Sequence, residues 1–90
     1  TAICIIMDIR HPNQPADLVF LEACKALQIP IHILLNKADK LSKNQAMQAC
    51  MAYEKTAAFQ SLPHGSVQIF SARTRQGFET LGAKLQDWCA

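Results

Sequence analysis

Three short apolar runs, each followed by a polar break and a segment of helical periodicity, constrain the fold of this chain most strongly. The runs are residues 2–7, 31–35 and 67–70, and the second is apolar throughout apart from His32. A strand that is covered on both faces, as in a parallel sheet, has this composition. The order β-α-β-α-β-α therefore predicts an α/β protein with a three-layer α/β/α parallel sheet and right-handed crossovers.

Three helices are predicted after the three runs. The first begins at about Pro15, and the second opens with Ser42 and Gln45 in a capping-box arrangement and continues toward Phe59. Each helix has an apolar stripe at helical spacing. The stripes are Phe20, Leu21, Cys24 and Leu27 in the first helix, Met47, Cys50 and Met51 in the second, and Phe78, Leu81, Leu85 and Trp88 in the third.

Composition and charge narrow the class of protein. Ninety residues, half of them apolar, suit one small domain, and the net charge of +2 does not by itself indicate DNA, RNA or a membrane as partner. No apolar run approaches the ~20 residues of a membrane span. The first residues lack the basic start and the cleavage site of a signal peptide. We expect a cytoplasmic protein that binds neither DNA nor membranes. The start without Met, directly in a strand, suggests a cut chain.

The four cysteines are scattered singly. Cys4, Cys24, Cys50 and Cys89 form no C-x-x-C pair and have no histidine at the spacing of a zinc site. Each falls on an apolar face, which predicts buried, reduced thiols rather than disulfides. No metal-binding residue is predicted in this chain.

The polar loop after the second run carries the clearest candidate chemistry. It reads Asn36-Lys37-Ala38-Asp39, and ligands of parallel α/β sheets bind at the carboxyl ends of the strands. The Asp39 carboxylate can accept two adjacent hydrogen bonds, which suits N1 and N2 of guanine. Asn36 can hold the loop or reach a ring nitrogen, and the stem of Lys37 can cover the base. The alternative is a polar loop whose side chains only satisfy backbone groups.

A second loop, after the third run, is expected to meet the first. The residues concerned are Phe70, Ser71 and Ala72. Neighbouring strands lie about 5 Å apart, so both loops can contact one ligand. A backbone N–H near Ala72 could donate to an acceptor such as guanine O6, and Ser71 could orient Asp39 by a hydrogen bond.

Several motifs resemble the bacterial EngB (YihA/YsxC) family of P-loop GTPases, across essentially the whole chain. They are Met7-Asp8-Ile9-Arg10-His11-Pro12, Ile29-Pro30-Ile31-His32, Asn36-Lys37-Ala38-Asp39-Lys40-Leu41-Ser42, Ser71-Ala72, Gln76-Gly77-Phe78-Glu79-Thr80-Leu81 and Trp88. The resemblance implies that residues 1–90 are the C-terminal half of one GTP-binding domain. It also implies that residues 36–39 and 70–72 bind the base of GTP or GDP.

The resemblance further implies a GTPase that acts in large ribosomal subunit assembly and in cell division and septation. The family's P-loop and its Mg²⁺-binding segments lie upstream of the part that this chain resembles. We therefore expect no catalytic residue here and no activity of the 90-residue chain alone. The alternative is a non-catalytic α/β interaction module with a degenerate base-binding loop. A P-loop motif upstream of residue 1 would favour the enzyme.

The remaining candidates have plainer interpretations. The frame from Gly77 to Lys84 is not a P-loop, because it lies within the predicted third helix. Asp8 is expected to bond loop N–H groups at a strand end, and His32 to be a half-buried, hydrogen-bonded histidine. Trp88 is expected to pack against Phe78 in the core. The other candidates are surface cations or polar residues, which form either a solvated rim or contacts to phosphates of ribosomal RNA: Arg10, His11, Lys40, Lys43, Arg73 and Arg75.

The first predicted strand has an unblunted edge. It contains no proline and no charge before Asp8. In the GTPase fold this edge pairs with the strand that leads into the P-loop, which this chain lacks. Unpaired backbone groups along an apolar strand favour association, so we expect the isolated chain to self-associate.

Overall fold

The computed structural model describes residues 2–89, with side chains as far as residue 87. Strands and helices alternate as predicted, with one short extra helix. The strands are β1 (Ile3–Asp8), β2 (Ile31–Asn36) and β3 (Gly65–Ile69), and the helices are α1 (Pro15–Ala26), α2 (Lys43–Glu54), α3 (Ala57–Gln60) and α4 (Phe78–Cys89). A single 3₁₀ turn, Ala38–Lys40, follows β2.

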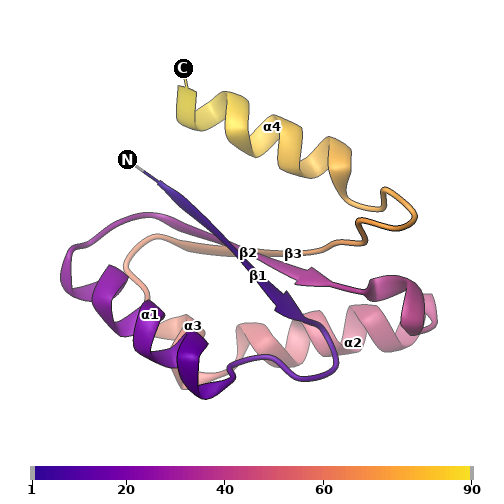
Figure 1. Ribbon diagram of the computed structural model, residues 1–90, viewed down its shortest axis with the longest axis horizontal. Helices are drawn as coiled ribbons and strands as arrows, with labels where there is room; N and C mark the ends of the chain where they lie inside the picture. Colours follow the sequence, from indigo (N-terminus) through magenta and orange to yellow (C-terminus); the bar gives the residue numbers. More distant parts are fainter. Residues whose placement is uncertain (1, 90) are drawn as a thin grey trace.

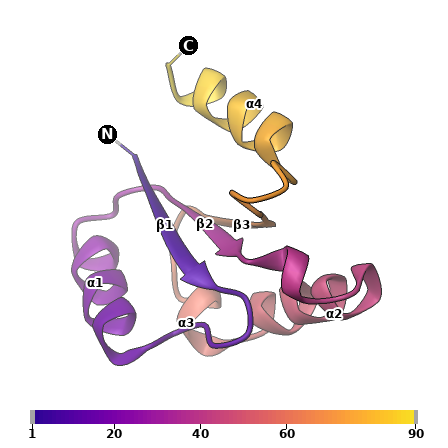
Figure 2. The same ribbon diagram turned by 45° about the vertical axis from the view of Figure 1, so that its right-hand side comes forward.

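The three strands form one parallel sheet in the order β1-β2-β3. Helices α1, α2 and α3 lie on one side of it, and α4 lies alone on the other (Figure 1). The turned view separates α4 from the other helices in the same way (Figure 2). The predicted three-layer α/β/α arrangement is therefore confirmed.

The larger core lies between the sheet and the α1–α3 layer. Successive side chains of a strand point to opposite faces, so alternate residues of each strand enter this core. Leu21 and Cys24 of α1 and Ala46 and Tyr53 of α2 close it from the helical side. The buried strand residues in it are Ile5, Met7, Ile31, Ile33 and Leu35. The continuous apolar runs follow from this arrangement, because the remaining strand residues face the α4 side.

The α4 face of the sheet is more polar and less completely covered. Leu34 is buried, and the ring of Phe70 stacks on that of Phe78 of α4, with centroids 5.0 Å apart. His32 is buried here too, and its ring nitrogens bond Ser66 and Gln68. This confirms the prediction of a hydrogen-bonded histidine, although it is fully rather than half buried.

Two helix predictions need correction. The second helix does not continue to Phe59, because Thr56 ends it and caps a new turn. The Thr56 hydroxyl donates to the carbonyl of Tyr53 at 2.7 Å and accepts from the N–H of Phe59 at 3.3 Å, so α3 starts in a new direction. In the first predicted stripe, Leu21 and Cys24 are buried, but Phe20 and Leu27 are exposed. Met47 and Met51 of α2 and Phe78 and Leu85 of α4 are exposed as well, so only part of each predicted stripe faces the core.

The thiols also differ from the prediction. Cys24 is buried and Cys50 partly buried, but Cys4 is exposed, because it lies on the part of β1 that α4 does not cover. All three are free, as expected. The predictions for Cys89 and for the packing of Trp88 lie outside the described side chains. Within residues 2–89, no helix has the length and apolar character that a membrane span requires.

Candidate functional site

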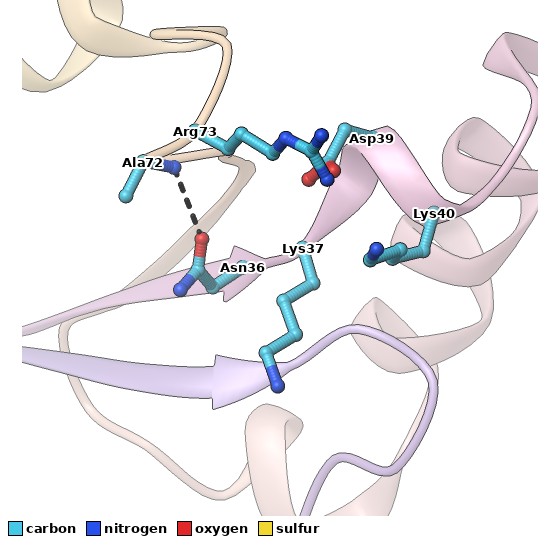
Figure 3. Close-up of a pocket in the computed structure, with 6 residues that line it drawn as sticks. All are labelled: Asn36, Lys37, Asp39, Lys40, Ala72 and Arg73. Carbon is cyan, nitrogen blue, oxygen red and sulfur yellow. Dashed lines mark hydrogen bonds between the residues drawn. The ribbon is translucent and has the colours of Figure 1, made fainter.

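A pocket of about 250 Å³ opens where β2 and β3 end, between the loops that follow them. Figure 3 shows the side chains that line it. One is the last residue of β2, three come from the loop after it and two from the loop after β3, so segments far apart in sequence share one cavity. The lining residues are Asn36, Lys37, Asp39, Lys40, Ala72 and Arg73.

The loop after β2 turns sharply at Lys37. This residue has a left-handed backbone, with φ of 65°. The turn brings Ala38 under the second loop, where its N–H donates to the carbonyl of Phe70 at 3.2 Å. Ala38 is buried as a result, and the 3₁₀ turn that follows directs Asp39 into the pocket.

Asp39 is held from the opposite loop. The Ser71 hydroxyl donates to Asp39 Oδ1 at 2.8 Å, as predicted, and accepts from the N–H of Thr74 at 3.2 Å. The Ser71 hydrogen bond, with the nearby charges of Lys40 and Arg73, lowers the pKa of Asp39. The carboxylate is therefore ionised at neutral pH, and as an acceptor it suits a ligand edge that presents N–H groups.

A second hydrogen bond joins the two loops. The N–H of Ala72 donates to Asn36 Oδ1 at 3.2 Å, the dashed line in Figure 3. Of the two roles predicted for Asn36, the structure shows that of holding the loop. The same N–H is the one predicted to face a ligand carbonyl, so a ligand acceptor at this position must share or replace the Asn36 bond.

Lys37 leans toward β1 rather than across the pocket (Figure 3). Its Nζ lies 3.7 Å from Asp8 Oδ2. Asp8 in turn accepts from the backbone N–H and the guanidinium of Arg10. These bonds to Arg10 lower the pKa of Asp8 to about 2. Asp8 thus bonds a loop N–H at a strand end, as predicted, and Arg10 and His11 are exposed.

Known proteins resemble the chain in sequence over nearly its whole length. No family model matches the chain. Proteins described as "Probable GTP-binding protein EngB" are 40% identical to it in Nitrosococcus oceani, 36% in Hydrogenovibrio crunogenus and 41% in Pasteurella multocida. These alignments cover 96–98% of this chain but only 40–42% of the relatives. The chain is homologous to the EngB GTP-binding proteins.

A solved structure supports the fold independently. Translation elongation factor SelB from Methanococcus maripaludis, crystallised with the GTP analogue GppNHp, superposes with a TM-score of 0.77. The match covers 96% of this chain and 19% of SelB at 20% identity. The EngB homologue therefore shares the fold of a part of SelB, and it spans about 40% of the length of its EngB relatives.

The pocket of this EngB homologue contains four of the seven predicted base-binding residues. Ala38, Phe70 and Ser71 are buried behind it and support the loops instead. Lys40 and Arg73 line it but were assigned only to a cationic rim. The sequence indicated them only by their position, because each directly follows a residue that was predicted to bind the base. Lys43 and Arg75 do not line the pocket.

Two further predictions concern other sites. Gly82 and Lys84 lie within α4, which confirms that the frame starting at Gly77 is not a phosphate-binding loop. Within residues 2–89 no group of three or more His, Cys, Asp or Glu side chains is placed to hold a metal ion.

Proposed function

We propose that this chain is the guanine-recognition part, and the C-terminal half, of the GTP-binding domain of a GTPase. The observation that carries the proposal is the ionised Asp39, fixed by Ser71 inside a pocket at the carboxyl ends of β2 and β3. Homology to the EngB GTP-binding proteins supports a guanine nucleotide as the ligand.

Each pocket residue has a role in this proposal. Asp39 accepts from N1–H and the exocyclic amine of guanine, and Ser71 sets the orientation of the carboxylate. Ala72 N–H donates to O6, and this bond shares or replaces its hydrogen bond to Asn36 Oδ1. Lys37 lines the pocket on its β1 side with Nζ 3.7 Å from Asp8, so its methylene stem covers the ring only after the side chain swings across the pocket.

The whole protein would hydrolyse GTP with Mg²⁺, and its phosphate and metal ligands would come from outside residues 1–90. Phosphoryl transfer depends on positioning the phosphates and the metal, so this chain supplies specificity rather than chemistry. We further propose a cytoplasmic role in large ribosomal subunit assembly and in cell division. In this proposal Lys40 and Arg73, which line the pocket, would be the cations that contact phosphates of ribosomal RNA.

The test replaces Asp39 with Asn in the full-length protein. Asparagine offers one acceptor and one donor, so guanine loses a hydrogen bond while xanthine, with a carbonyl at position 2, gains one. Because guanine loses a hydrogen bond and xanthine gains one, the preference for GDP over xanthosine diphosphate should fall about tenfold or more. Competition titration measures this preference.

The matched control is Asp87→Asn, the same chemical change on the exposed surface of α4, which should leave the preference unchanged. An unchanged preference in Asp39→Asn would remove Asp39 from the base site. A full-length protein that binds no guanine nucleotide would favour the alternative of an interaction module.

A further inference from the structure

Gln68 is a buried polar residue just behind the pocket. It lies on the α4 face of β3 with 8% of its surface exposed. Its amide nitrogen donates to the carbonyl of Gly77 at 2.8 Å and to that of Ile69 at 3.2 Å. Its Oε1 lies 2.6 Å from His32 Nε2. Because an amide oxygen only accepts, His32 Nε2–H is the donor of that bond.

Gly77 is the far end of the loop that carries Ala72 and Arg73. Its backbone is left-handed, with φ of 85°, and a Cβ here would lie 2.4 Å from the carbonyl oxygen of Ile69 and 2.7 Å from the Gln68 amide nitrogen. The loop therefore passes so close to β3 that a side chain at position 77 would clash with it, and only glycine fits. Gln68 is the side chain that holds it there.

The near end of the loop is fixed separately. The N–H of Ser71 donates to the carbonyl of Gln76 at 3.0 Å, and the Ser71 hydroxyl bonds Asp39. The loop is thus closed on itself, anchored to the first loop through Ser71 and to the sheet through Gln68. Ala72 lies between these two anchors, so its N–H direction depends on both.

We propose that Gln68, oriented by His32, is a positioning residue for base specificity, acting on the loop that presents the Ala72 N–H. This inference rests on the proposed guanine recognition. Gln68 itself does not line the pocket. Loss of its amide donor leaves the Gly77 carbonyl without this partner, and the loop can relax away from β3. The hydrogen bond from Ala72 to the carbonyl at position 6 of the base is then weakened, while the hydrogen bonds of Asp39 to the base at position 2 persist.

The experiment uses the full-length protein with Gln68→Glu. Ionised glutamate keeps an acceptor for His32 Nε2–H, cannot donate to Gly77 and sets a negative charge against the Gly77 and Ile69 carbonyl oxygens, so the loop side of the network is broken. Gln68→Met, of similar length and without either polar group, is the second variant. Two affinity ratios are measured by titration: GDP over 6-thio-GDP, which changes only the acceptor at position 6, and GDP over xanthosine diphosphate.

The wild type should prefer GDP over 6-thio-GDP about tenfold, and both variants should lose most of that preference. Their preference for GDP over xanthosine diphosphate should stay within about twofold of wild type. The control is Leu62→Ala, a core truncation away from the loop, which lowers stability but should leave both ratios unchanged.

Each result separates the two proposals. A wild type without affinity for guanine nucleotides overturns the proposed function and this inference with it. A wild type that prefers GDP, with Gln68 variants that keep the preference at position 6, overturns the inference alone. Loss of both ratios in Leu62→Ala as well as in the Gln68 variants would reduce Gln68 to a general contribution to stability, and would also overturn it.

Discussion

The carboxyl end of the sheet and the edge of β1 differ in how far their polar and apolar groups have partners within the chain. At the carboxyl end, two loops are joined by the Ser71–Asp39 and Ala72–Asn36 hydrogen bonds. At the edge, β1 pairs only with β2 among the described strands, and Ile6 is 60% exposed on the α4 face. The two loops of the candidate site are therefore joined by hydrogen bonds, whereas apolar side chains at the β1 edge remain exposed.

The outer surface of α1 extends this contrast. Val19 and Leu27 are 73% and 72% exposed, next to the partly exposed Phe20. A helix with apolar residues around most of its circumference is normally buried. Contiguous apolar surface of this kind marks an interface or a tendency to associate. The comparison teaches that hydrogen bonds between two loops can order a pocket even where apolar side chains elsewhere in the chain are exposed.

The largest expected effect concerns the 90-residue chain alone. With β1 unpaired on one side and Ile6 and Val19 exposed, it should be oligomeric or aggregated, and it should bind GTP weakly at best. Sedimentation velocity measures the first property. Ile6→Lys places a charge on the edge strand and should shift the distribution toward monomer. A stable, soluble wild-type monomer would show that the unpaired β1 edge does not cause self-association, and would contradict the contrast between the two regions.

The second effect concerns the loop after β3, at the carboxyl end of the sheet. Gly77→Ala in the full-length protein should lower the free energy of unfolding by about 2 kcal/mol or more, because the left-handed backbone and the Ile69 carbonyl both exclude a Cβ. Gly82→Ala is the matched control. Gly82 lies in α4, where a methyl group would have no neighbour within 4 Å, and alanine there should stabilise by ~0.5–1 kcal/mol. Urea unfolding measures both; equal effects would mean that the loop is not held as tightly as its contacts indicate.

The smallest effect is a pH dependence at the carboxyl end of β1. The pKa of Asp8 is about 2 in the folded protein, below its ordinary value of 3.8, chiefly because of Arg10. Its contribution is therefore fully present above pH ~4 and is lost as the pH falls through 2. The pair is at the surface, so we expect less than ~1 kcal/mol.

Asp8→Asn should be slightly less stable than wild type at neutral pH, and the difference should shrink below pH ~4 and vanish below pH ~2, as measured by urea unfolding across this range. Arg10→Met removes the main cause of the pKa shift and should abolish most of the same dependence. A constant difference between Asp8→Asn and wild type at all pH values would contradict the role of the ion pair.

The sequence predicted the parallel sheet and its layers well, because continuous apolar runs are typical of strands that are covered on both faces. The helical stripes were poorer guides to burial, since Phe20, Leu27, Met47 and Met51 are exposed. The sequence also predicted the meeting of Ser71 with Asp39, since parallel strands end at the same edge. These are properties that periodicity and topology determine. The break at Thr56 was not predicted, because a capping threonine inside an apolar helix pattern is ambiguous until its partners are known.

Three features of the site required the structure. The Ala72 N–H bonds Asn36, a pairing of backbone with side chain that spacing does not specify. Phe70 turns its ring away from the pocket to stack on Phe78, because its position in the strand alternation faces α4. Gln68 looked like an ordinary strand residue, and only its burial beside the Gly77 carbonyl indicates a role.

The pair of hydrogen bonds between the two loops also has a consequence for how β3 finds its place. A slip of one residue between β2 and β3 would turn Val67 and Ile69 out of the main core, so the apolar pattern rejects odd slips. A slip of two keeps every face correct but moves Ser71 about 7 Å along the strand, out of reach of Asp39. The polar contacts therefore disfavour the even slips that the apolar pattern tolerates, so they help to fix the register of β3 against β2.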